Sequence, residues 1–113
     1  MKYDAVIYTR TACYKQNDST PLQEQENACR EFCRKQGYEV AGVFHDMGKS
    51  GMKFNRPGLC KLLSFCRINR VKHVVVKDYA RLSRNPSDSL YLQTRIFALG
   101  MSLHSVGVEK PRG

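Results

Sequence analysis

Short runs of β-branched and aromatic residues alternate with helical patterns along this chain, and this alternation limits its possible folds more than any other feature. The predicted strands are residues 4–10, 38–44, 72–77 and 101–106. The predicted helices open at Pro21, Pro57 and Pro86, since a proline is tolerated in the first helical turn. Because crossovers between parallel strands are right-handed, this order predicts an α/β three-layer sandwich. We expect a central, mostly parallel sheet of about four or five strands with helices on both faces.

Apolar residues recur at helical spacing and predict which side chains face the sheet. Gly37 and Gly100 are expected to stop the first and third helices. The consecutive valines of residues 74–76 predict a strand buried on both faces, as in a parallel sheet. The predicted apolar helix positions are Leu22, Ala28, Cys29, Phe32 and Cys33, then Leu59, Leu62, Leu63, Cys66 and Ile68, then Leu90, Leu92, Ile96, Phe97 and Leu99.

Charge is unevenly distributed over this single-domain chain of 113 residues, whose formal net charge is +9. Residues 53–84 hold nine lysines and arginines and one acid, so this block alone carries 9 − 1 = +8. A basic block favours a polyanion such as nucleic acid as the partner. A solvated basic face with no partner is the alternative. Charge alone does not separate the two.

Several classes of protein are disfavoured by composition. The sequence has no apolar run long enough for a membrane span or a signal peptide. An odd count of five cysteines without a signal peptide favours reduced thiols in a cytoplasmic protein. Asp46 and Asp78 are isolated in the sequence, which makes them weak candidates for magnesium ligands, so no metal and no cofactor are expected.

Arginines gather in loops that should lie at one edge of the predicted sheet. Ligand sites in open α/β sheets form at the carboxyl ends of the strands. The loops there are 10–20, 45–56 and 78–86, and their arginines are Arg10, Arg56, Arg81 and Arg84. A guanidinium donates two parallel hydrogen bonds to phosphate oxygens and keeps its charge. These arginines are therefore expected to converge on one phosphate and to stabilise charge on a transferring phosphoryl group without a metal.

Four sequence blocks, in order, resemble the catalytic domain of the serine recombinases, the resolvase and invertase family. The first is Tyr8-Thr9-Arg10-Thr11-Ala12 at the end of a strand, followed by Gln16. The others are Leu22-Gln23-Glu24-Gln25, then Asp46 with Ser50-Gly51 and Arg56-Pro57, then Arg81-Leu82-Ser83-Arg84. The resemblance extends from about Val6 to about Val106.

The resemblance implies a chemistry and a set of site residues. In this family a serine hydroxyl attacks a phosphodiester of double-stranded DNA, forms a 5′-phosphoseryl bond and frees a 3′-hydroxyl, and the ends are exchanged within a synaptic tetramer of two dimers. By matching positions, the phosphate-binding residues would be Arg10, Arg56, Arg81 and Arg84. Lys77, from the same basic block, is a further candidate for a DNA phosphate contact. The residues that shape the site would be Tyr8, Gln25, Asp46 and Ser50. A role in a bacterial mobile element is also implied.

The nucleophile position holds Ala12, which cannot attack phosphorus. Three interpretations stay open: the chain is inactive and keeps its DNA-binding face, a neighbour such as Cys13, Thr11 or Thr9 has taken over, or the alignment is locally shifted. The alternative functions are an inactive DNA-binding or oligomerisation module, and an unrelated small phosphate-binding domain.

The resemblance also implies what surrounds this domain, whereas some residues have structural interpretations that do not depend on it. Residues 1–107 are expected to form the catalytic domain, and residues 108–113 to lead toward a dimerisation helix and a DNA-binding region. Tyr8 could instead be ordinary strand packing, and Gln25 a surface residue of its helix. The three histidines, His45, His73 and His104, are interpreted as dispersed structural residues.

Overall fold

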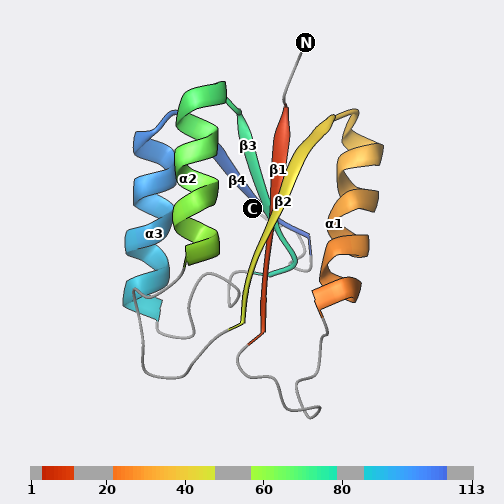
Figure 1. The fold of residues 1–113 in the computed structure, drawn as a ribbon, viewed down its shortest axis with the longest axis horizontal. Helices are drawn as coiled ribbons and strands as arrows, with labels where there is room; N and C mark the ends of the chain where they lie inside the picture. The colour runs from red at the N-terminus through yellow and green to blue at the C-terminus, as the bar shows by residue number, and fades with distance from the viewer. Residues whose placement is uncertain (1–3, 12–21, 48–56, 79–85, 107–113) are drawn as a thin grey trace, which may run out of the picture.

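The computed structural model describes residues 4–11, 22–47, 57–78 and 86–106 and forms the predicted three-layer α/β sandwich (Figure 1). Its elements are β1 (Ala5–Thr11), α1 (Leu22–Gln36), β2 (Val40–Met47), α2 (Pro57–Asn69), β3 (His73–Val76), α3 (Pro86–Ala98) and β4 (Ser102–Ser105). All three strand pairs are parallel, in the order β2-β1-β3-β4. The fold class predicted from the alternation of strands and helices is therefore confirmed.

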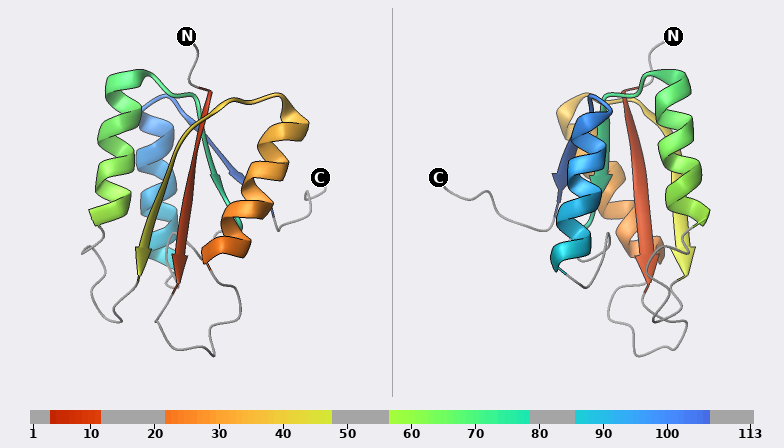
Figure 2. Two further views of the ribbon diagram at one scale, coloured as in Figure 1. Left: turned by 45° about the vertical axis from the view of Figure 1, so that its right-hand side comes forward. Right: turned by 90° about the vertical axis from the view of Figure 1, so that its left-hand side faces the viewer.

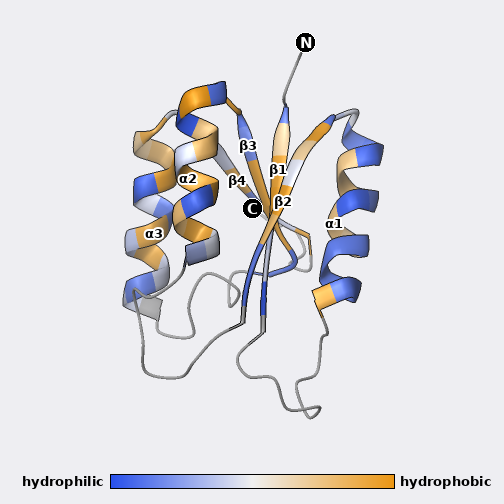
Figure 3. Cartoon of the chain, in the orientation of Figure 1, coloured by the Kyte–Doolittle hydropathy of each residue, from blue (hydrophilic) through white to orange (hydrophobic). Residues whose placement is uncertain are grey.

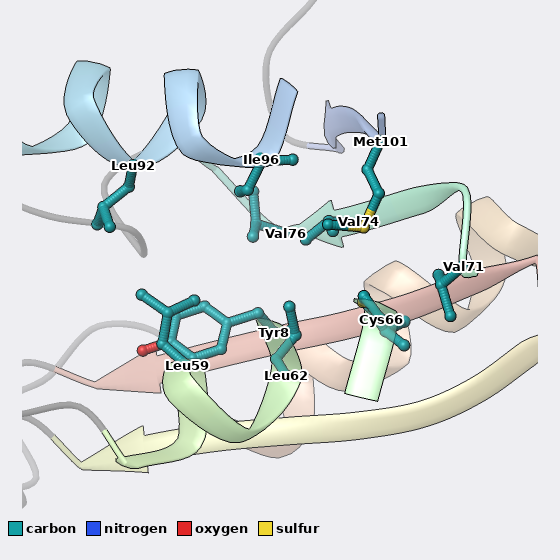
Figure 4. Close-up of a cluster of buried hydrophobic side chains, with 11 residues drawn as sticks. Tyr8, Leu59, Leu62, Cys66, Val71, Val74, Val76, Leu92, Ile96 and Met101 are labelled. Atoms are coloured by element: carbon teal, nitrogen blue, oxygen red, sulfur yellow. The ribbon is translucent and has the colours of Figure 1, made fainter. Parts of the chain in front are cut away.

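The helices divide between the two faces of the sheet, with α1 on one face and α2 and α3 on the other (Figures 1 and 2). Each helix carries both polar and apolar residues (Figure 3), and its buried apolar residues pack against the strands. The larger core lies under α2 and α3 and includes Tyr8, Leu62, Val74, Val76 and Ile96 (Figure 4). The smaller core lies under α1 and contains Ala5, Ile7, Cys29, Cys33 and Val75. Val74, Val75 and Val76 are all fully buried, as their position in an inner parallel strand requires.

Two details of the sequence prediction were wrong. His45, Asp46 and Met47 were expected in a loop, but β2 continues through them because they pair with residues 9–11 of β1. Ile68, Leu90, Phe97 and Leu99 were expected to be apolar contacts and are exposed, Ile68 by 73%. Successive residues on a helix are about 100° apart, so Leu90 and Phe97 cannot share the face that Leu92 and Ile96 bury.

No helix in the described parts of the chain is long and apolar enough to cross a membrane. Three cysteines belong to the two cores: Cys29 and Cys33 of α1, and Cys66 near the end of α2. Burial raises the pKa of the Cys29 thiol to about 12 and that of the Cys66 thiol to about 12. Such thiols stay protonated near neutral pH, which fits a packing role.

The fold brings together two histidines that are far apart in the sequence and that the sequence analysis interpreted as dispersed. His73 Nδ1 lies 3.0 Å from His104 Nε2, and the Tyr38 ring stacks on His73 with 4.1 Å between ring centroids. The pair forms because β3 and β4 are neighbours and His104 lies opposite Val75, two residues from His73 on the same face. Partial burial lowers the pKa of both imidazoles, and for His104 the neighbouring His73 lowers it further.

Because of this histidine pair, we expect the stability of the fold to decrease in mild acid. The unfolded chain takes up protons near the ordinary histidine pKa of 6.5, whereas the folded chain resists them. The unfolding free energy is therefore expected to hold above that pH and to decline as pH falls below it. Urea unfolding at several pH values would measure this. The double variant His73→Gln/His104→Gln should show a shallower decline, and a variant at the exposed His45, His45→Gln, should match the wild type. Equal slopes in all three proteins would contradict the prediction.

Candidate functional site

Several predicted site residues lie at the carboxyl edge of the sheet. Arg10 of β1 pairs directly with Asp46 of β2, and Lys77 follows the last residue of β3. This edge is at the lower end of the strands in Figure 1, where the arrowheads of β1 and β2 lie. The described part of the site is therefore built on the ends of three adjacent strands.

The Asp46 carboxylate links three elements at this edge. It accepts a hydrogen bond from the Tyr8 hydroxyl at 2.7 Å. It also accepts from the backbone N–H groups of Gly58 at 2.7 Å and Leu59 at 3.0 Å. The first N–H groups of a helix lack intrahelical partners and favour a negative charge. Asp46 therefore caps α2, although it belongs to β2 and does not directly precede the helix in the sequence. The buried carboxylate thus fixes the start of α2 against β1 and β2.

Gly58 allows this close approach of helix and strand. A Cβ atom added at Gly58 would lie 2.2 Å from the carbonyl oxygen of His45 and 2.9 Å from Asp46 Oδ1. No side chain fits there without a shift of the backbone. Nothing in the local sequence shows that β2 runs against Gly58, so this contact could not be predicted.

Gln25 of α1 secures the end of β1 from the opposite face. Its side-chain Oε1 accepts from the Arg10 N–H at 3.0 Å, and its Nε2 donates to the Arg10 carbonyl at 3.0 Å. The pairing of β1 with β3 stops at Tyr8 and Val76. The amide therefore makes the two hydrogen bonds that a longer β3 would make. Gln25 is fully buried, so the interpretation of it as a surface residue was wrong.

Arg10 is a buried arginine, only 8% exposed, at the carboxyl edge of the sheet. Side chains alternate along a strand, so Arg10 points to the same face as Tyr8, the face covered by α2 and α3. Its backbone is held by Gln25, and the neighbouring Asp46 is held by α2. The strand end that carries this guanidinium is thus fixed from both sides of the sheet.

The remaining predicted site residues lie outside the described residues: Ala12, Ser50, Arg56, Arg81 and Arg84. So do Gln16 and Cys13. The described residues bring together Tyr8 with Asp46 and Gln25 with Arg10, while Lys77 is half-buried at the same edge. Within the described ranges, no three His, Cys, Asp or Glu side chains come together as a metal site.

Known proteins share both the sequence pattern and the fold. The sequence profile described as "Resolvase, N terminal domain" matches residues 5–112. The catalytic domain of TP901-1 integrase is similar with a TM-score of 0.81 and 28% identity, over 91% of this chain and 77% of that one. The catalytic domain of ISC1926 TnpA, an IS607-like serine recombinase, has a TM-score of 0.77 and 28% identity, over 96% of this chain and 71% of that one.

A third structure extends the likeness of fold. A resolvase family site-specific recombinase from Streptococcus pneumoniae has a TM-score of 0.76 at 24% identity, over 95% of this chain and 75% of that one. The TM-scores show that these structures share the overall α/β fold of this chain, a parallel sheet covered by helices. With a profile match over nearly its whole length, the chain belongs to the resolvase N-terminal domain family, the catalytic domains of the serine recombinases.

Proposed function

We propose that this chain is the catalytic-type domain of a site-specific DNA recombinase and that it binds a DNA phosphate at the carboxyl edge of its sheet. The observation that carries the proposal is the fixed, buried Arg10 at that edge. A guanidinium that is shielded from water can bind an anion that reaches the carboxyl edge of the sheet. Membership of the family supports DNA as the source of that anion.

The site residues divide into phosphate-binding and positioning groups in this proposal. The phosphate-binding group is Arg10, Arg56, Lys77, Arg81 and Arg84. Tyr8, Gln25 and Asp46 act as positioning residues, because their polar atoms bond to each other or to the backbone of neighbouring elements. Ser50 is assigned to the same group from the family resemblance alone.

Strand exchange needs a nucleophile that this sequence lacks at the expected position. In the proposed reaction a hydroxyl at position 12 attacks phosphorus, the 3′-oxygen leaves with a proton, and the phosphate remains on the protein as a phosphoester. Ala12 offers no hydroxyl. We therefore propose that the chain, with Ala12, binds DNA without cutting it, and that Ala12→Ser supplies the missing nucleophile. Assembly into dimers and synaptic tetramers is part of the same proposal.

A covalent-adduct assay tests this proposal. The native protein and Ala12→Ser would each be mixed with a supercoiled plasmid carrying the DNA that flanks the protein's own gene. A protease-sensitive protein–DNA band is expected after denaturation with Ala12→Ser and not with the native protein. The matched control Ala12→Ser/Arg10→Ala should lose the band, because the guanidinium would be absent.

Three other results would contradict it. No band with Ala12→Ser would exclude a site that lacks only its nucleophile. A band of equal strength after removal of Arg10 would exclude the phosphate role of that residue. A band with the native protein that disappears in Cys13→Ala would assign the attack to the thiol.

A further inference from the structure

The three helices in the described parts of the chain end with the same backbone turn, but one of them places an arginine where the others have glycine. The residue after each turn returns its N–H to the carbonyl five residues back: Tyr38 to Cys33 at 2.9 Å, Val71 to Cys66 at 3.1 Å and Met101 to Ile96 at 3.2 Å. The preceding residues have positive φ: Gly37 at 79°, Arg70 at 55° and Gly100 at 86°. Arg70 is the one non-glycine residue with positive φ in the described part of the chain.

The turn itself does not explain why position 70 is an arginine. A positive φ is unfavourable for residues with a Cβ, and glycine would form the same turn without that cost. Among the described residues, the Arg70 side chain makes no hydrogen bond or ion pair within the domain. A strained residue without a structural partner points to a use for its side chain outside the fold.

Two further cations lie beside Arg70. Arg67 is in the last turn of α2 and Lys72 precedes β3, and all three side chains are exposed. Neither neighbour forms an ion pair with a described residue. The backbone of Lys72 contacts Asp4, but the Asp4 carboxylate accepts the backbone N–H of Glu39. We call Arg67, Arg70 and Lys72 the distal basic triad.

The distal basic triad is remote from the candidate site. The C-terminal end of α2 and the start of β3 lie at the upper end of the domain in Figure 1, and the arrowheads of β1 and β2 lie at the lower end. Both views in Figure 2 show the same separation. Attraction to the negative end of the helix accounts for Arg67 in the last turn, but it does not require a strained Arg70.

We propose that the distal basic triad is a second contact surface for nucleic acid, which binds the sugar–phosphate backbone of a duplex independently of base sequence. Two guanidiniums and an ammonium present donors that suit phosphate oxygens. Each phosphate contact releases counterions, so binding through this surface depends on salt. The proposal does not rest on recombination, because it needs neither the carboxyl edge nor a nucleophile.

The variant Arg70→Gly separates binding from folding. It removes the charge and the positive-φ strain together, so the melting temperature is expected to rise by about 3–6 °C. Affinity for a fluorescein-labelled duplex of about 20 base pairs and arbitrary sequence is expected to fall about three- to tenfold at about 100 mM salt. The slope of log affinity against log salt should decrease by about one. Fluorescence anisotropy measures both quantities.

Two matched variants decide the interpretation. Arg70→Lys keeps the charge and should bind within about twofold of the wild type. Lys35→Ala removes an exposed cation from the last turn of α1, on the other face of the sheet, and should also bind nearly as the wild type does. Equal affinity and slope for Arg70→Gly and the wild type would overturn the proposal. So would an equal loss in Lys35→Ala, because net charge alone would then explain the effect.

Discussion

Gln25→Glu is expected to lower the unfolding free energy by about 3 kcal/mol at pH 7, a large share of the stability of a small domain. The Gln25 amide is fully buried, donates to the Arg10 carbonyl and accepts from the Arg10 N–H. An ionised carboxylate has no proton to donate, so it would face that carbonyl with one bond lost and a charge buried. Urea unfolding of the variant and the wild type would measure the difference.

The same variant should regain stability in acid. A protonated carboxyl can donate and accept, as the amide does, so the folded state would bind a proton more tightly than the unfolded state. Relative to the wild type, the stability of the variant should then rise from pH 7 to about 5, the reverse of the trend for an ordinary carboxylate. Gln25→Leu removes both bonds without a charge and should lack this recovery. Gln23→Glu, on the exposed side of α1, should change little. If the unfolding free energy of Gln25→Glu equals that of the wild type, the end of β1 does not depend on this amide.

The fold was predictable because each element carries its own local signal. The valines of β3 predict a buried strand, and the prolines near the helix starts predict helices, without knowledge of the rest of the chain. The errors arose where tertiary pairing decides. β2 extends through Asp46 because β1 continues beside it, and the exposed Leu90 and Phe97 are apolar residues that their helix turns away from the sheet.

For the candidate site residues that the structure describes, the sequence predicted a shared place in the fold but not their contacts. Resemblance to the family pointed to Tyr8, Gln25 and Asp46, and all of them belong to the hydrogen-bonded groups at the edge of the sheet. The partners could not be predicted, since the Asp46 bonds to α2 depend on how closely the helix approaches β2. The link between His73 and His104 was missed for the same reason, because it depends on the register between β3 and β4.

The described residues of the basic block at 53–84 lie at both ends of the fold and do not form one surface (Figure 1). Helix α2 runs opposite to the strands, so its start lies near the carboxyl edge and its end lies at the other edge of the sheet (Figure 1). Lys77 is therefore grouped with Arg10, whereas Arg67, Arg70 and Lys72 are at the far end. The basic run in the sequence thus predicted a polyanion partner, but it did not predict over how many surfaces of the fold these charges are distributed.

Gly58→Ala is expected to lower the unfolding free energy by about 3 kcal/mol through steric conflict rather than through lost charge. The added methyl would lie 2.2 Å from the His45 carbonyl oxygen, a backbone atom that cannot rotate away. The start of α2 must then move, which lengthens the bonds from Gly58 and Leu59 to Asp46. Denaturant unfolding would measure the loss. Gly37→Ala is the matched control, because a Cβ there meets no atom within 4 Å and only the positive φ disfavours it.

The same substitution also tests whether α2 positions the proposed site. Arg56 directly precedes Pro57, the first residue of α2, so a displaced helix start displaces the point from which Arg56 enters the proposed phosphate site. In the Ala12→Ser background, Gly58→Ala should reduce the covalent DNA adduct at temperatures where circular dichroism shows the protein folded. Gly37→Ala in that background should leave the adduct unchanged, because its turn lies at the other end of the domain. An undiminished adduct in folded Gly58→Ala would mean that the Asp46 cap stabilises the fold without serving the phosphate site.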